Sequence, residues 1–173
     1  MRAALFLAGT LAAASPLIER QSTYSTDPNA ACGLQPFGYG PPSTTDTNFL
    51  SNPLISAFAL YAPVPKDYNA AFRNLTGSTQ QAGYMGYYLM NLYNSTQCAG
   101  YCNSASGCTA FNLYFERDPL LNPSDNCQNP LATTNVKCTL WSSSVSAATA
   151  TNTGQYREQF HVVIAGSDGF NHN

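Results

Sequence analysis

Six cysteines constrain this chain more than any other feature, and four of them follow a spacing typical of a small disulfide-stabilised module. Cys98 and Cys102 are one helical turn apart, Cys108 follows closely, and Cys138 comes after a longer interval. An even number of cysteines is typical of chains whose thiols pair in an oxidising compartment. The C-x2-C pairs and histidine partners of common zinc sites are absent from the sequence. We therefore expect disulfides, and we predict neither a metal site nor a cofactor.

The start of the chain has the anatomy of a secretory signal. Arg2 supplies one positive charge, and residues 3–14 form an apolar stretch that ends in three alanines. Twelve helical residues span roughly 18 Å, less than the ~30 Å hydrocarbon core of a bilayer, so a membrane anchor is the weaker interpretation. We expect a signal peptide over residues 1–14. Residues 15–20 are either a removed pro-segment or the start of the mature chain.

Charge is sparse, which narrows the classes of partner. Charged residues make up 9% of the chain, and the formal net charge is −2. No cluster of Lys or Arg is present, so neither nucleic acid nor an anionic membrane is the expected partner. Two glycosylation sequons, at Asn74 and Asn94, fit a protein that is secreted into the extracellular space or the cell wall.

The remaining length suits one domain with two parts. Residues 21–82 are rich in Pro, Thr, Ser and Asn, and we expect an irregular N-terminal arm packed on the main body. Within this arm, the apolar residues 54–61 suit a short helix or strand. Residues 83–173 form the expected main module.

The main module has the pattern of a helix on an antiparallel sheet. Asn94 is a candidate N-cap with Gln97 three residues later, which predicts a helix over residues 94–103. Aromatic and alternating segments predict strands, at residues 84–90, 109–116, 136–141 and 160–164. Two long loops, 118–135 and 142–155, are expected to be functional or covalently held. The predicted fold class is α+β.

The pattern C-x3-C-x5-C-x2-F followed by C-x-L resembles the PAN/apple module, a disulfide-stapled helix on an antiparallel sheet. A broader stretch is similar to a family of secreted, largely uncharacterised fungal proteins. The segments that carry this second resemblance are residues 35–41, 83–87, 115–119, 153–155 and 159–167. The chain differs from apple domains in its 118–135 insertion and in lacking an outer cysteine pair.

The apple resemblance implies a disulfide pattern. It implies that Cys98 pairs with Cys138 and Cys102 with Cys108, which leaves Cys32 for Cys127. A bond between Cys127 and Cys138 is the competing pattern. The resemblance also implies a role in recognition, since PAN/apple domains generally bind glycans or proteins.

An enzyme is the less favoured interpretation, because no nucleophile, base and orienting group are evident. His161 and His172 are expected to be structural or exposed. Glu116 and Asp118 flank Arg117 and could form a carboxylate pair for glycoside hydrolysis, although a local ion-pair cluster fits the pattern better.

Aromatic side chains are the best candidates for binding a glycan or an extracellular protein. Alternation places Tyr114 and Trp141 opposite the core-facing Leu113 and Leu140, so we expect both rings to be exposed. Removal of the Trp141 ring would then weaken binding without unfolding the domain. The predicted binding residues are Tyr114, Glu116, Arg117, Asp118, Trp141 and Arg157. The expected function is a secreted, non-catalytic recognition module; the alternative is a structural, wall-associated glycoprotein.

Overall fold

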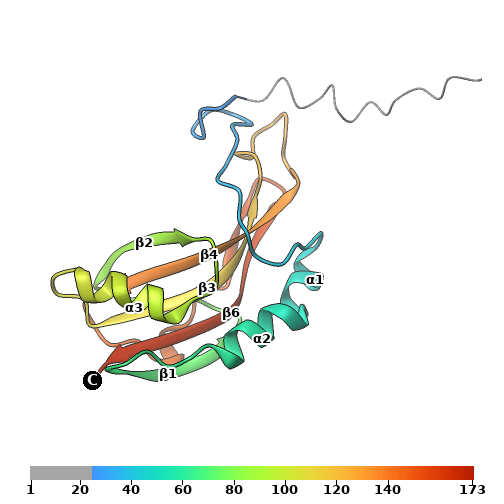
Figure 1. Cartoon of the computed structure of the whole chain (residues 1–173). Coiled ribbons are helices and arrows are strands. Elements are labelled where there is room, and N and C mark those ends of the chain that lie inside the picture. The colour runs from blue at the N-terminus through green and yellow to red at the C-terminus, as the bar shows by residue number, and fades with distance from the viewer. Residues whose placement is uncertain (1–24) are drawn as a thin grey trace, which may run out of the picture.

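The computed structural model describes residues 25–173, so the predicted signal peptide and the segment 15–20 lie outside the described residues. The described chain is built on one twisted sheet with its three α-helices on one face (Figure 1). The α+β class expected from the sequence is confirmed.

Six strands form the sheet, and every pairing is antiparallel. The strands are β1 (Tyr68–Leu75), β2 (Tyr84–Met90), β3 (Ala110–Pro119), β4 (Ala132–Trp141), β5 (Gly154–Arg157) and β6 (Phe160–His172). Their order is β1-β6-β3-β4-β2, and β5 pairs with β6 outside this path. The long strands β3, β4 and β6 therefore form the centre of the fold.

Local capping explains where the helices begin. The helices are α1 (Asp46–Leu50), α2 (Pro53–Tyr61), α3 (Ser95–Ser104) and a short 3-10 helix, η2 (Ala147–Thr149). The side chains of Thr45, Asn52 and Asn94 accept hydrogen bonds from the first turns of α1, α2 and α3. The predicted N-cap at Asn94 is thus confirmed, and residues 54–61 adopt the helical one of the two expected conformations.

All three expected disulfides are present. The Cα atoms are 5.7 Å apart in Cys98–Cys138, 5.3 Å in Cys102–Cys108 and 5.9 Å in Cys32–Cys127. The first bond joins α3 to β4, the second closes the turn between α3 and β3, and the third ties the arm to the loop between β3 and β4. This loop covers residues 120–131 and is shorter than the predicted 118–135 loop, because β3 and β4 pair beyond the predicted strand ends. The competing Cys127–Cys138 pattern is wrong.

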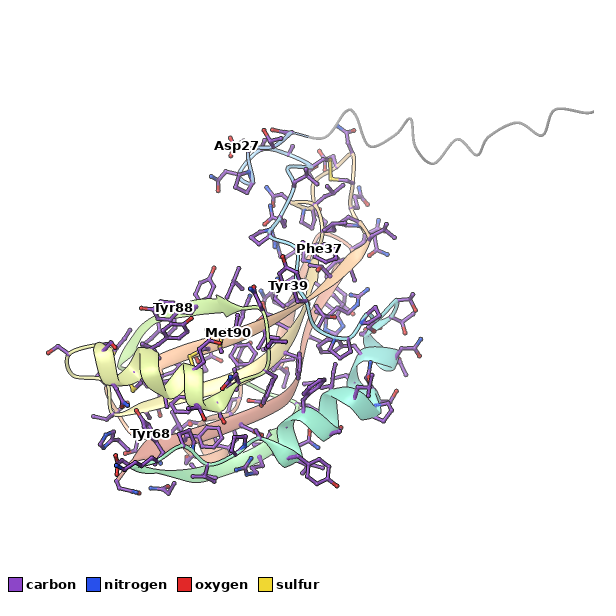
Figure 2. The ribbon with its side chains drawn as sticks, in the orientation of Figure 1. Asp27, Phe37, Tyr39, Tyr68, Tyr88 and Met90 are labelled. Atoms are coloured by element: carbon purple, nitrogen blue, oxygen red, sulfur yellow. A yellow bond between two sulfur atoms is a disulfide. The ribbon has the colours of Figure 1, made fainter. Side chains whose placement is uncertain are left out.

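The helix-bearing side of the sheet, which we call the first face, holds the main core. Phe111, Leu113 and Phe115 of β3 point to this face and are fully or almost fully buried. α3 packs on β3 and β4, and α1 and α2 pack on β6. Figure 2 shows Tyr88 and Met90 of β2 on the side of α3, where the Tyr88 ring stacks on Tyr101 at 4.1 Å between centroids.

The N-terminal part is more regular than expected. Residues 68–75 form the edge strand β1, which pairs with β6 from Tyr68 opposite His172 to Leu75 opposite Ser167. A division of the chain at residue 83 therefore cuts through the sheet. The segment gave no strand signal because two register shifts interrupt β1, so its buried side chains do not alternate.

The opposite side, which we call the second face, differs most from the expectation. Tyr114 is only 5% exposed and Trp141 only 3%, so the predicted exposure of both rings is wrong. Trp141 packs with Phe72, Ala110 and Val145 in a second apolar cluster. Val145 lies in the loop after β4, which folds back over this face instead of extending into solvent.

A candidate binding groove on the second face

The second face is covered at the Trp141 end and hollowed beside it. The hollow has a volume of about 530 Å³. Its lining residues come from the 78–81 loop, from β2, β3 and β4 and from the segment before and within β5: Ser78, Thr79, Gln80, Gln81, Tyr84, Tyr87, Tyr114, Lys137, Thr139, Trp141, Asn152 and Gln155. We call this hollow the groove.

Two exposed tyrosines form one wall of the groove. Tyr84 is 53% exposed and Tyr87 54% exposed. Residues three apart in a regular strand point to opposite faces, but a register shift between Tyr84 and Gly86 turns both rings to the second face. Gly86 permits the shift because its φ of +117° is a conformation that side-chain-bearing residues rarely adopt. The Tyr84 ring meets Trp141 edge to face at 5.4 Å between centroids.

Hydrogen bonds hold the floor of the groove. The Trp141 indole Nε1 donates to Thr139 Oγ1 at 3.2 Å, and the Thr139 hydroxyl donates to the Asn112 carbonyl at 3.1 Å. Asn112 in turn accepts the amide hydrogen of Thr79 at 2.7 Å, which fastens the 78–81 loop to β3. Burial raises the pKa of Tyr114 well above its ordinary value, so this phenol remains neutral. The floor is therefore rigid and uncharged.

Amide side chains stand at the rim. Gln81 Nε2 donates to Ser143 Oγ and to the Ser144 carbonyl, both at 3.0 Å, which ties the two covering loops together. Gln80 and Gln155 are exposed, and no hydrogen-bond partner of their side chains is found among residues 25–173. These two amides are available to donate to and accept from a polar ligand.

A charged cluster closes one end of the groove. Lys137 forms ion pairs with Glu116 and, at 3.2 Å, with Asp118. Burial and the neighbouring Asp118 raise the pKa of Glu116 to about 7. Burial opposes the charge on Lys137, but the two carboxylates outweigh it and raise its pKa. The Lys137 ammonium also lies 5.5 Å from the centre of the Tyr87 ring.

The structure brings together four of the six predicted binding residues. Tyr114 and Trp141 line the groove, and Glu116 and Asp118 contact its Lys137. Arg157 lies elsewhere, where its guanidinium donates to Asn122 Oδ1 at 2.7 Å and holds the loop between β3 and β4.

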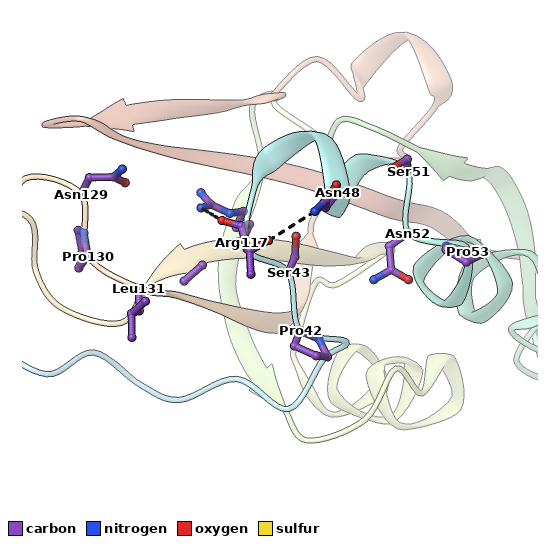
Figure 3. Close-up of a pocket in the computed structure, with 12 residues that line it drawn as sticks. Pro42, Ser43, Asn48, Ser51, Asn52, Pro53, Arg117, Asn129, Pro130 and Leu131 are labelled. Atoms are coloured by element: carbon purple, nitrogen blue, oxygen red, sulfur yellow. Dashed lines mark hydrogen bonds between the residues drawn. The ribbon is translucent and has the colours of Figure 1, made fainter. Parts of the chain in front are cut away.

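Arg117 points to the first face because it lies between Glu116 and Asp118 on β3. It borders a larger cavity of about 770 Å³, with α1 on one side and Asn129 to Leu131 on the other (Figure 3). Its guanidinium donates to the carbonyls of His161 at 2.7 Å and Thr44 at 3.2 Å, and it lies over the Phe160 ring. Arg117 thus clamps the arm to β6, although its Nε is buried without a hydrogen-bond partner among residues 25–173.

The sequence did not single out the side chains that make the groove accessible. Tyr84 and Tyr87 are two of the eleven tyrosines in the chain, and Lys137, Gln80 and Gln155 belong to no motif. The available signal was Gly86 between the tyrosines, because an isolated glycine in a strand pattern indicates a bulge.

Other kinds of site find less support in the described part of the chain. Residues 25–173 contain no group of three His, Cys, Asp or Glu side chains that could hold a metal ion. The same part of the chain has no helix that is both long and apolar enough to cross a membrane.

A scan against protein-family models, a search of curated proteins and a search of solved structures each returned no match.

Proposed function

We propose that this protein is a secreted, non-catalytic recognition module that binds carbohydrate in the groove of the second face. The observation that carries the proposal is the pair of exposed tyrosine rings beside free glutamine amides and a rigid floor. Sugars present apolar C–H faces and hydroxyl edges, so aromatic rings and amides together match their chemistry. A protein partner would fit a flatter surface with an apolar centre better than a hollow lined by both aromatic rings and amides.

The resemblance to PAN/apple modules and to secreted fungal proteins supports the same proposal. A helix joined to the sheet by Cys98–Cys138, with Cys102–Cys108 at its end, is the arrangement that the resemblance implies. Three disulfides also suit an oxidising, extracellular environment.

The non-catalytic part of the proposal rests on the carboxylates. Glu116 and Asp118 both bind the Lys137 ammonium, and the negative charge of Asp118 adds to burial in raising the pKa of Glu116. Both carboxylates are thus engaged by one largely buried ammonium, which leaves neither of them free to act as the nucleophile or base of a glycosidase. His161 lies apart, paired with Asp46 at 2.8 Å.

A glycan array tests the proposal. We expect the wild-type protein to bind a restricted set of oligosaccharides and the Tyr87→Ala variant to lose most of that signal. The Tyr156→Ala variant is the matched control, because Tyr156 is 70% exposed but is not part of the groove. Absence of any glycan signal from the folded wild-type protein would contradict carbohydrate binding and favour the structural, wall-associated alternative.

A further inference from the structure

A second hollow on the molecule is apolar and lies on the first face, away from the groove. It has a volume of about 490 Å³ and lies between the arm, the end of α2 and the turn that leads into α3. Tyr39 is 68% exposed, Phe58 49% and Leu92 69%, and all three line it. Figure 2 shows Tyr39 on the arm beside the central strands. Exposed apolar side chains that gather in one place usually have a covering partner. We call this hollow the Asn94 cleft.

The rim of the cleft carries a glycosylation sequon. Asn94 and Thr96, the first and third residues of the sequon, both line the cleft and are exposed. Ser95 between them is buried, and its hydroxyl donates to the Pro63 carbonyl at 2.6 Å. This contact fixes the sequon against the end of α2.

Helix capping orients the side chain of Asn94. Its Oδ1 accepts the amide hydrogen of Gln97 at 3.0 Å, as the N-cap of α3. The amide nitrogen, Nδ2, has no hydrogen-bond partner among residues 25–173 and is the atom to which an N-linked glycan is joined. The other sequon differs, because Asn74 is half-buried within β1 and does not line the cleft.

We propose that an N-linked glycan on Asn94 is the occupant of the Asn94 cleft, with its first N-acetylglucosamine against Phe58 and Leu92. The inference rests on the proposed function, because a chain receives N-linked glycans only when it is secreted, as that function includes. The donor is a lipid-linked oligosaccharide pyrophosphate. A bond forms between Nδ2 and C1 of the first sugar, the C1–O bond to the pyrophosphate breaks, and the pyrophosphate leaves as the amide loses a proton.

A covalently attached sugar suits this cleft better than a free partner. Attachment at the rim keeps the first sugar at a high effective concentration over the apolar side chains. The sugar covers them with its C–H face and leaves its hydroxyl groups in water. The cleft is then occupied by the glycan attached to Asn94, and the groove on the second face remains open for a ligand.

Expression in a glycosylating eukaryotic host, behind a heterologous secretion leader, tests the inference independently of the native signal. Peptide mass spectrometry should find the glycan on Asn94. The glycoprotein should bind severalfold less of an apolar fluorescent dye than the Thr96→Ala variant, which lacks the sequon but keeps the N-cap. Replacing Phe58 by Ser in both proteins should remove most of that difference.

Enzymatic removal of the glycan supplies a matched control, because it converts Asn94 to aspartate. The Asn94→Asp variant, treated with the same enzyme, has the same covalent structure and keeps a good N-cap, so the two proteins should bind equal amounts of dye. An unoccupied Asn94 would overturn the inference. So would equal dye binding with and without the glycan, or dimerisation of the Thr96→Ala variant through this cleft. Oligosaccharide binding by the Thr96→Ala variant tests the groove separately.

Discussion

The two faces of the sheet are closed by different means. On the first face, α3 lies on β3 and β4, and the fully buried Cys98 and Cys138 join the two layers covalently. On the second face, loops cover the Trp141 end through hydrogen bonds and a small apolar cluster, and the groove stays open beside them. Beneath α3, where a helix and a disulfide close it, the first face has little capacity to admit a ligand. A face closed by loops keeps polar groups and aromatic rings at the surface, so recognition is expected there.

The largest expected effect on stability comes from removing the disulfide that joins α3 to the first face. Replacing both Cys98 and Cys138 by Ala should lower the free energy of unfolding by about 4 kcal/mol, because the bond spans 40 residues and restricts the unfolded chain. Replacing Cys102 and Cys108, which span 6 residues, should cost only about 2 kcal/mol. Urea denaturation under non-reducing conditions measures both. Equal losses of stability in the two double variants would show that the length of the closed loop does not determine how much each disulfide contributes.

Closure of the second face depends on Trp141. Replacing this buried ring by Ala should cost about 3 kcal/mol of stability, because it leaves a cavity among Phe72, Ala110 and Val145. Thermal unfolding of Trp141→Ala and of the conservative Trp141→Phe variant measures the effect, and Trp141→Phe should lose less. A Trp141→Ala protein with the wild-type melting temperature would mean that the loops do not pack on the ring.

The disulfides of α3 were predictable from the sequence, whereas the burial of Trp141 was not. The Asn94 cap is a local signal that predicts α3, and the cysteine spacing predicts its disulfides through a resemblance to another module. Strand β1 was missed because its partner lies about a hundred residues away and bulges disturb its pattern. Alternation along β3 and β4 separated the two faces but could not reveal that residue 145 and its neighbours fold over one of them. The exposure of Tyr114 and Trp141 was therefore misjudged.

The charged end of the groove predicts a pH dependence. The pKa of Glu116 is raised to about 7 in the folded protein, so the folded state holds this proton more tightly than the unfolded chain. The stabilisation is fully present below the unfolded pKa and is lost as the pH rises through about 7. Asp168, buried on β6 beside β1 and with a pKa that burial raises to about 6, adds a smaller loss with the same sign.

Urea denaturation at pH 5 and pH 8 measures this dependence. Glu116→Gln should remove about 2 kcal/mol of the loss in unfolding free energy between the two pH values. Asp46→Asn is the control, because a hydrogen bond from His161 lowers the pKa of Asp46, so this carboxyl stays ionised throughout the window and its replacement should leave the loss unchanged. An unchanged pH profile in Glu116→Gln would place the titrating group outside the groove.

Binding in the groove should give the smallest change in free energy and the most informative one. Trp141 is the only tryptophan of the chain and lines the groove, so its fluorescence reports occupancy directly. Titration with an oligosaccharide identified on the array should change the Trp141 emission to saturation. Tyr87→Ala should weaken the fitted affinity at least about tenfold, or ~1.4 kcal/mol, and Tyr156→Ala should leave it unchanged. Binding that persists by calorimetry without any change in Trp141 emission, and with full affinity in Tyr87→Ala, would contradict the assignment of recognition to the second face.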